Sequence, residues 1–342
     1  MEVYFGDILE IKNGRNQKKV ESPNGRYPIY GSGGIMGYAD EYICESDTVV
    51  IGRKGSINNP IYVTEPFWNV DTAFGLVANR DVLNPRYLYY FCKHFDFQKL
   101  NKTVTIPSLT KSDLLKIRFE LPILDEQKRI VKLLDRISEI IDLQNEELKQ
   151  LDLLVKARFV EMFGDPEINS RGLQVLGWKD VFITTTGKLD SNEMTSKGKY
   201  PFFTCAKESF WIDQYAFDCE ALLLAGNNAA GNYDVKHYKG KFNAYQRTYV
   251  LRFVNGNWSY VLFKIQLENK LEYLRTQSKG TNTRYLTMGI LESLQFIIPD
   301  IDEQIEFETF VHQTDKLKAI IQKQIEKTNL LFDSLMQQYF GY

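Results

Sequence analysis

The chain has 342 residues, of which 44% are apolar and 25% are charged, with a formal net charge of −2. These values are typical of a globular protein with one to three domains, and the near-neutral charge does not by itself indicate a nucleic-acid-binding protein. We expect no membrane span and no signal peptide, because no apolar run has the required length and the N-terminus lacks a basic region. The four cysteines and three histidines are scattered. They indicate reduced thiols in a cytoplasmic protein and argue against a zinc site or a histidine-based triad.

Residues 1–121 are predicted to form a β-rich domain. The stretch Asp47–Gly55 is a short apolar run bounded by turn residues, which is typical of a strand. The stretch Asn84–Phe95 has helical spacing, and its aromatic side chains are expected in the core rather than at a binding surface.

Residues 122–164 are predicted to form one long helix. Its apolar positions keep an alternating spacing of three and four residues, interrupted once at Gln144: Leu134, Ile137, Ile141, Leu148, Leu151 and Val155. This heptad pattern is typical of a helix that packs lengthwise against another helix. We expect a rod of roughly 55 Å that ends at Gly164.

Residues 165–298 are predicted to form a second β-rich domain, with strands in Ala221–Asn228 and Arg247–Phe253 and a helix in Asn257–Leu274. Residues 299–342 are predicted to form a second long helix that ends at Gly341. The apolar seam expected for it consists of Phe310, Leu317, Ile321, Leu331 and Leu335, with Thr314, Gln324 and Thr328 as polar interruptions.

The chain contains an internal repeat. The phrase LPILDEQ at 121–127 returns as IPDIDEQ at 298–304, a shift of 177 residues, and NGRYP at 24–28 returns as KGKYP at 197–201, a shift of 173. Each copy is a large segment followed by a long helix, so the sequence predicts two versions of one unit and a pseudo-twofold arrangement.

The repeated DEQ triplet lies at the start of both long helices. The preceding proline and the aspartates Asp125 and Asp302 are explained by a helix start, where a carboxylate accepts bonds from free backbone N–H groups. The repeated Glu126, Gln127, Glu303 and Gln304 are less well explained in this way. We hypothesise that these four residues contact a partner protein; the alternative is a pair of helix starts and nothing more.

No stretch indicates an active site. The segment GSGGIMG at 31–37 lacks the spacing of a dinucleotide loop, and GRKGS at 52–56 is not a phosphate-binding Walker loop. We find neither an Asn-Pro-Pro-Tyr methyltransferase motif nor a carboxylate cluster typical of a metal-dependent nuclease.

Glycine-rich loops with basic, amide and aromatic residues occur in both large segments. Arg, Lys, Asn and Gln recognise base edges, whereas Lys, Arg, Ser, Thr and backbone N–H groups bind phosphates. The candidate DNA-binding residues in the first segment are Arg15, Lys18, Lys19, Tyr30, Ser32, Arg53, Lys54, Ser56, Lys102, Thr103, Thr105, Ser108 and Lys111. Those in the second are Lys207, Asn227, Asn228, Tyr245, Gln246, Arg247, Lys279, Thr281, Asn282, Thr283 and Arg284. The alternative for each single loop is a solvated turn.

The sequence resembles the DNA-specificity subunit of Type I restriction–modification systems over essentially its whole length. The resemblance is carried by the opening FGDILEIKNG, by YPIYGSGGIMGY, by VVIGRKGS and by the repeated L-P-x-x-DEQ start of each long helix. The second copy departs from it, because GRKGS becomes AGNNAAG and YGSGG becomes FTCAK. Such a difference is expected if the two domains recognise different bases.

The resemblance implies an α+β protein without catalytic activity. It has two β-rich target-recognition domains, 1–121 and 165–298, and two long helices, 122–164 and 299–342, which pack antiparallel as a coiled-coil-like spacer. It binds a split, asymmetric double-stranded DNA target and two modification subunits, optionally with two restriction subunits. S-adenosylmethionine, ATP and magnesium are expected on those partners, and this chain is expected to hold no cofactor and no metal. Two other functions stay open at this point: a self-sufficient DNA methyltransferase or nuclease, and a scaffold or inhibitor that does not recognise DNA.

Overall fold

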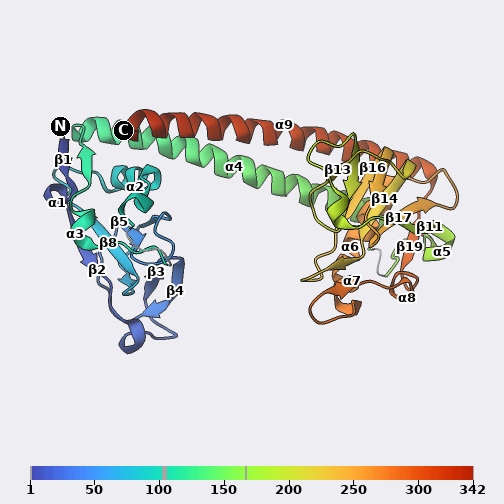
Figure 1. Cartoon of the computed structure of the whole chain (residues 1–342), viewed down its shortest axis with the longest axis horizontal. Helices are drawn as coiled ribbons and strands as arrows, with labels where there is room; N and C mark the ends of the chain where they lie inside the picture. Colours follow the sequence, from blue (N-terminus) through green and yellow to red (C-terminus); the bar gives the residue numbers. More distant parts are fainter. Residues whose placement is uncertain (1, 102–105, 166–167, 342) are drawn as a thin grey trace. The chain divides into compact units, whose positions relative to one another are not determined.

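The computed structural model describes residues 2–101, 106–165 and 168–341. The chain divides into two compact units (Figure 1). Unit 1 consists of Met1–Glu146 and Gln322–Tyr342, and unit 2 consists of Glu147–Ile321. Each unit therefore contains one β-rich domain and parts of both long helices. No helix in the described part of the chain is long and apolar enough to cross a membrane.

The β-rich domain of unit 1 is built on a four-stranded sheet and a three-stranded sheet. The four-stranded sheet has the order β2-β8-β5-β6, from Leu9–Asn13, Ala73–Ala78, Thr48–Gly52 and Ile61–Val63. The three-stranded sheet has the order β4-β3-β7, from Gly34–Ala39, Tyr27–Gly31 and Trp68–Asn69. The other elements are β1 (Glu2–Tyr4) paired with β9 (Arg118–Glu120), and α1 (Phe5–Ile8), η1 (Gln17–Lys19), α2 (Pro85–His94), η2 (Phe97–Leu100) and α3 (Lys111–Leu114).

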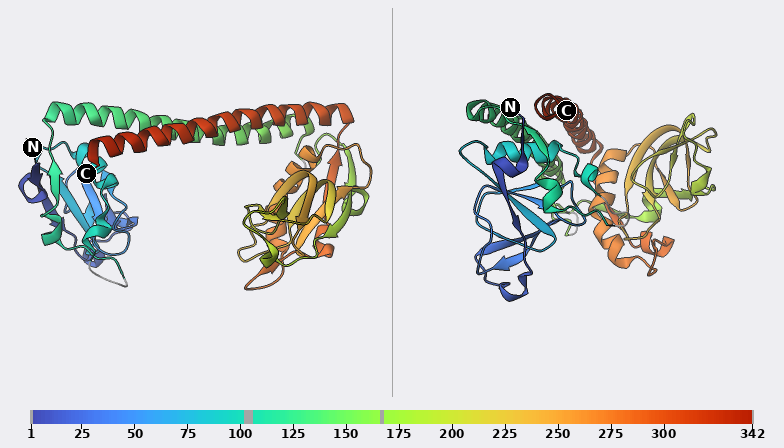
Figure 2. Two further views of the ribbon diagram at one scale, coloured as in Figure 1. Left: turned by 45° about the horizontal axis from the view of Figure 1, so that its top comes forward. Right: turned by 60° about the vertical axis from the view of Figure 1, so that its left-hand side comes forward.

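The β-rich domain of unit 2 is built on one curved, six-stranded sheet (Figure 2). Its order is β11-β17-β14-β16-β12-β13, from Phe182–Thr186, Thr248–Phe253, Phe217–Ala225, Val235–Ala244, Tyr200–Phe203 and Phe210–Ile212. Two short pairs accompany it: β10 (Gln174–Gly177) with β19 (Gln295–Ile298), and β15 (Asn227–Asn228) with β18 (Arg284–Tyr285). The helices are α5 (Trp178–Val181), η3 (Ser191–Glu193), α6 (Tyr260–Asn269), α7 (Leu271–Gln277) and α8 (Met288–Leu291).

The predicted elements are largely confirmed, with one difference. Strand β5 lies within 47–55, and α2 begins after Asn84, whose side chain accepts bonds from the Arg86 and Tyr87 amides. The single helix predicted in Asn257–Leu274 is divided into α6 and α7 at Lys270. All four cysteines are free thiols, and burial raises the pKa of Cys44 to about 12.

The long helices α4 (Leu124–Phe163) and α9 (Ile301–Phe340) each have 40 residues. In unit 1 the core contains Leu134 of α4 together with Phe332 and Phe340 of α9, and the rings of Tyr87 and Phe340 lie 5.0 Å apart. In unit 2 the core contains the opposite ends, with Phe159 of α4 5.7 Å from Phe307 of α9. The two helices are therefore antiparallel, and each of them is part of both hydrophobic cores.

The apolar seam predicted for α4 agrees with the structure, whereas the seam predicted for α9 agrees only in part: Ile321 is buried and Phe310 and Leu335 pack against the cores, but two leucines are exposed. Leu317 and Leu331 are each 51% exposed. The buried positions are spaced by three, four or seven residues: Phe307, Val311, Thr314, Ile321, Ile325 and Phe332. The polar Thr314 is tolerated in the seam because its hydroxyl donates to the Phe310 carbonyl at 3.0 Å.

The ends of the long helices also differ in part from expectation. Asp125 and Asp302 are the second residues of their helices rather than caps in front of them, so they act as first-turn acids at the positive end of the helix dipole. Gly164 ends α4 as predicted, with a φ of 76° and an N–H that donates to the Val160 carbonyl at 2.8 Å. The amide of Gly341 makes the equivalent bond to Gln337 at 2.9 Å.

Candidate functional site

Three of the candidate loops in unit 1 meet at one place. A Cβ atom added to Gly52 would lie 3.0 Å from the Cβ of Ser32, so the β3–β4 turn directly contacts the turn 52–56. The amide of Gly55 donates to the Pro107 carbonyl at 3.1 Å, and the amide of Leu109 donates to the Arg53 carbonyl at 2.9 Å. Loops far apart in sequence therefore form one continuous surface.

The loop that begins at Arg15 joins this surface through β7. The Arg15 amide donates to the Asn69 carbonyl at 2.9 Å, and Asn69 is the register partner of Tyr30. Burial is the main cause of the raised pKa of Tyr30, so its hydroxyl remains protonated and can donate a hydrogen bond. The exposed members of this surface are Arg15, Lys18, Lys19, Arg53, Lys54 and Ser56, and Tyr30, Ser32 and Ser108 are half-buried.

One unit 1 candidate must be corrected, and three lie outside the described residues. The ammonium group of Lys111 donates to the Ile11 carbonyl at 2.7 Å and is half-buried, so it ties α3 to β2 instead of pointing to a ligand. Lys102, Thr103 and Thr105 lie outside the described residues.

The four candidate loops of unit 2 also meet. The Arg247 carbonyl accepts a bond from the Gly226 amide at 2.8 Å and lies 3.4 Å from the Cys205 sulfur. Asn227 pairs with Tyr285, and Tyr285 exchanges backbone bonds with Lys279. These contacts connect loops 203–209, 225–232, 243–247 and 278–284.

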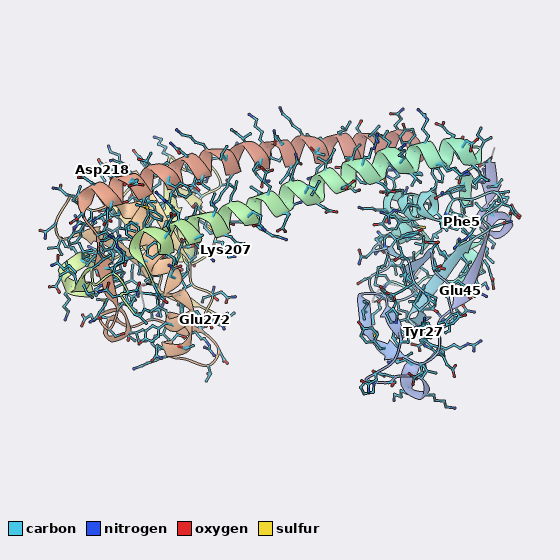
Figure 3. All side chains as sticks on the ribbon, turned by 180° about the vertical axis from the view of Figure 1, so that it is seen from behind. Phe5, Tyr27, Glu45, Lys207, Asp218 and Glu272 are labelled. Atoms are coloured by element: carbon cyan, nitrogen blue, oxygen red, sulfur yellow. The ribbon has the colours of Figure 1, made fainter. Side chains whose placement is uncertain are left out.

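The side chains of this second surface differ in how free they are to contact a ligand. The exposed ones are Lys207 (Figure 3), Gln246, Arg247, Lys279, Thr281, Asn282 and Thr283, and Asn227 and Tyr245 are half-buried. Two half-buried candidates make hydrogen bonds to nearby backbone groups. The Asn228 side-chain oxygen accepts bonds from the Ala230 and Asn232 amides, and the Arg284 guanidinium donates to the Arg275 carbonyl. Both groups thus help to shape their own loops, and their contact with DNA stays a prediction.

The predicted partner role of Gln127 and Gln304 is wrong, because both side chains are buried, at 0% and 1% exposure. The Gln127 amide donates to the Val82 and Pro122 carbonyls at 2.9 and 2.8 Å and accepts from the Asn84 amide at 2.8 Å. Each glutamine therefore fixes the start of a long helix to its own β-rich domain.

Gln304 makes the equivalent bonds in unit 2. It donates to the Pro299 carbonyl at 2.9 Å and accepts from the Ser259 amide at 2.9 Å. Asn84 and Ser259 are the N-caps of α2 and α6, so both copies use glutamine to join a helix start to a helix cap.

The two glutamates of the DEQ triplets are half-buried and form ion pairs within the chain. Glu126 is 2.6 Å from Arg129, whose hydrogen bond lowers the pKa of the carboxyl group, and Glu303 is 2.9 Å from Arg171. Their proposed contact with a partner stays a prediction.

The long helices carry an apolar surface that the sequence reasoning missed. Four pairs of residues related by the 177-residue shift are all at least 46% exposed: Ile140 and Leu317, Leu143 and Ile320, Leu153 and Leu330, and Leu154 and Leu331. Unit 1 holds Ile140, Leu143, Leu330 and Leu331, and unit 2 holds the other four. The signal that could have revealed them was the repeat itself, because apolar residues recur at positions outside the buried seam.

These apolar residues spread over a broad outer face of each helix, because Leu153 and Leu154, like Leu330 and Leu331, are adjacent and point about 100° apart. Ile140 and Leu154 are 14 residues apart, about four turns, and each directly precedes a seam position. Because the helices pack antiparallel through equivalent seam positions, the equivalent faces lie on the same side of the pair. Each unit therefore carries four exposed apolar side chains on its parts of the two long helices, and we call this set the apolar flank.

Within the described residues, no group of three or more His, Cys, Asp or Glu side chains is arranged to hold a metal ion.

Comparison with known proteins identifies the class. The family model described as the Type I restriction modification DNA specificity domain matches residues 1–153 and 172–329. This match covers most of the chain and both copies of the repeat, so the chain belongs to that family. The family and the relatives below are named for specificity, not for catalysis.

Two curated relatives and two solved structures are similar to the chain. The Escherichia coli Type I restriction enzyme EcoDI specificity subunit is 34% identical over 165 residues, 45% of this chain and 36% of the relative. A putative Type I specificity subunit of Haemophilus influenzae, S.HindORF215P, is 29% identical over 148 residues, 41% of this chain and 38% of the relative. The matched segments thus span little more than a third of those relatives' own length.

The structural similarity extends over the whole chain. The S subunit of the Type I restriction–modification system from M. genitalium matches with a TM-score of 0.67 and 16% identity, covering 99% of this chain and 96% of that one. A chain from a study of complex assembly and conformational transition of the Type I system matches with a TM-score of 0.59 and 16% identity, covering 99% and 97%. At this identity the likeness establishes the fold, with two mixed α/β domains and two long helices.

Proposed function

We propose that the chain is the non-catalytic specificity subunit of a Type I restriction–modification complex and that each unit recognises one part of a split, asymmetric DNA target. The observation that carries the proposal is the convergence of candidate loops into one exposed surface in each unit. Both surfaces carry the basic and amide groups that recognise phosphates and base edges. The two surfaces differ in sequence, which supports recognition of two different half-sites.

The long helices support a role as spacer. Each runs without interruption for 40 residues and contributes to both hydrophobic cores. A continuous helix is stiff along its axis, so such a pair would restrict binding to half-sites at one separation, about one DNA turn for partners on the same groove face.

The apolar flanks support docking of two modification subunits. Exposed apolar residues that recur in both copies provide two equivalent surfaces, which suits two copies of one partner. In this proposal the partners carry the methyl transfer, S-adenosylmethionine, ATP and magnesium, optional restriction subunits join them, and the complex acts in the cytoplasm. Glu126 and Glu303 lie at the starts of the same helices and remain candidates for the rim of this contact.

Selection from a random DNA pool tests the DNA-binding part. We expect the chain with its modification subunits to enrich one bipartite sequence, with affinity that falls steeply as salt rises. Absence of any enriched sequence would reject the proposal. Methyl transfer by this chain alone with S-adenosylmethionine would support the self-sufficient enzyme instead.

A domain exchange separates recognition from the scaffold alternative. Replacing residues 1–121 with the corresponding domain of a relative should change one half-site and leave the other unchanged. An unaltered target sequence would favour a scaffold that does not recognise DNA.

Substitutions on the apolar flank test partner docking. Leu143→Ser in unit 1 and Ile320→Ser in unit 2 are each expected to weaken the binding of one of the two modification subunits. Native mass spectrometry would detect the loss of that subunit from the complex. Val160→Ser is the matched control, because Val160 is exposed on α4 but its equivalent, Gln337, is polar. Equal binding by all three variants would place the partner elsewhere.

A further inference from the structure

The β3–β4 hairpin of unit 1 ends in two adjacent apolar side chains that face solvent. Ile35 and Met36 are 55% and 59% exposed. In a regular strand, neighbouring side chains point to opposite faces. Here the register shifts between Ile29, which pairs with Gly37, and Tyr30, which pairs with Ile35, so Met36 has no partner in the ladder. This β-bulge allows both side chains to be exposed.

The backbone around these side chains is built to leave them room. A Cβ atom at Gly31 would lie 2.5 Å from the Met36 sulfur, so the Met36 side chain lies directly over Gly31. A Cβ atom at Gly33 or Gly34 would meet nothing within 4 Å, so the turn itself is thin and open. The hairpin tip therefore projects, with Ile35 and Met36 as its apolar part.

The hairpin tip belongs to the surface already assigned to DNA. Ser32, in the same turn, contacts the 52–56 turn that carries exposed Arg53 and Lys54. An apolar pair beside basic side chains matches the major groove, where the C5-methyl group of thymine is an apolar feature among polar base edges and phosphates.

Unit 2 has a different chemistry at the equivalent place. With the shift of 173 residues, Ile35 and Met36 correspond to Glu208 and Ser209, which are exposed and polar. The β12–β13 ladder pairs Phe202 with Phe210 and has no register shift. The bulge and the apolar pair are thus specific to unit 1.

We infer that Ile35 and Met36 are specificity-determining residues that contact thymine C5-methyl groups in the half-site recognised by unit 1, and that unit 2 makes no such contact through its β12–β13 turn. The inference rests on the proposed DNA-binding function and adds the chemical group that is recognised.

The test replaces thymine by deoxyuridine, which removes only the methyl group. With the selected target and the full chain in complex with its modification subunits, each thymine is replaced in turn and the Kd is measured by fluorescence anisotropy. At one or two thymines of one half-site we expect affinity to fall about fourfold per methyl group, the value for removing one buried apolar carbon.

Paired variants assign the effect to the hairpin. In Ile35→Ala/Met36→Ala, the ratio of the Kd values for deoxyuridine and thymine DNA should fall from about four to one at those positions. Glu208→Ala/Ser209→Ala is the matched control in unit 2 and should retain the fourfold ratio. Circular dichroism melting verifies that both variants are folded.

Three outcomes overturn the inference while leaving the proposed function intact. They are sequence-specific binding that no deoxyuridine replacement weakens, a unit 1 half-site without an A·T pair, and a hairpin variant that loses affinity equally on both DNAs. The last would show that the apolar pair packs against DNA without recognising the methyl group. Absence of any sequence-specific binding would instead reject the proposed function.

Discussion

Gln127 in unit 1 and Gln304 in unit 2 occupy the same position in the repeat and make the same kinds of bond. Each connects a long helix to the carbonyl of the preceding proline and to the N-cap of a helix in the β-rich domain. The hairpin tips of the two units, in contrast, differ at every position: none of the residues in Tyr30–Ile35 is identical to its equivalent in Phe203–Glu208.

The glycines show the same division. A Cβ atom on Gly14 would lie 1.8 Å from the Val70 carbonyl oxygen, and one on its equivalent Gly187 would lie 1.7 Å from that of Ala244. Both copies keep glycine where two backbones touch. Gly31, which makes room for an exposed side chain, has become Thr204 in the second copy. Residues that anchor a long helix to its domain, or that lie where two backbone segments touch, are constrained by packing. Residues that point into solvent are free to set specificity.

The largest effect is expected from charges in the helix seam. In Ile137→Asp/Ile141→Asp, two carboxylates enter the core of unit 1 without partners, and each costs about 3 kcal/mol of unfolding free energy. Urea unfolding should begin at much lower concentration, and the target spacing or the assembly should change. Ile140→Asp/Leu143→Asp, on the exposed flank of the same helix, is the control. Equal urea midpoints for the two double variants would contradict the prediction that Ile137 and Ile141 lie in the buried seam.

The next effect tests whether the two copies share their close backbone contacts. Gly14→Ala and Gly187→Ala each place a methyl group on a backbone oxygen, so we expect a loss of about 3 kcal/mol in either unit. Gly33→Ala, where the methyl group meets no atom within 4 Å, should leave the urea midpoint nearly unchanged. If the urea midpoint of Gly14→Ala equalled that of Gly33→Ala, the close backbone contact at Gly14 would not require glycine.

The glutamine attachments give a smaller and symmetric effect. Gln127→Leu and Gln304→Leu leave buried backbone groups without partners, which costs about 2 kcal/mol each. Faster hydrogen exchange at the Asn84 and Ser259 amides, respectively, would locate the loss. Glu126→Ala, which removes a surface ion pair with Arg129 in the same helix turn, should change stability by less than about 0.5 kcal/mol. If the leucine variants were as stable as this control, the attachment would not be energetically important.

The smallest stability effect belongs to the surface assigned to DNA. Arg53 is exposed, with its guanidinium 5.6 Å from the centre of the Phe74 ring. Arg53→Ala should weaken DNA binding about tenfold and leave the melting temperature nearly unchanged. Arg118→Ala, which removes an exposed arginine paired with Glu2, serves as the control. A lowered melting temperature with unchanged affinity would make Arg53 a structural residue.

The sequence predicted most of the fold because its signals are local or repeated. The heptad spacing of α4, the glycine ends and the duplicated DEQ triplet follow from helix geometry. The seam of α9 could be obtained only in part, because two of its five predicted positions are exposed. Its leucines at 317 and 331 and its true seam residues have the same local spacing, and only contact with α4 and the β-rich domains decides which set is buried.

For the candidate surface, the sequence identified which loops matter but not which atoms are available. Lys111, Asn228 and Arg284 have suitable chemistry, yet each side chain makes a hydrogen bond to the backbone of another residue of the chain. Gln127 and Gln304 were assigned to a partner because nothing in a linear helix start requires a glutamine. Their bonds reach residues some 45 positions away in sequence, which no local pattern reveals.

The sequence by itself determined that this protein is a duplicated unit with long helices and two non-identical sets of polar loops, because periodicity and repetition are properties of a linear chain. Tertiary structure alone decided which glutamines are buried, which leucines are exposed and that the scattered loops meet on one surface in each unit. Burial and hydrogen bonding depend on neighbours that are close in space and distant in sequence.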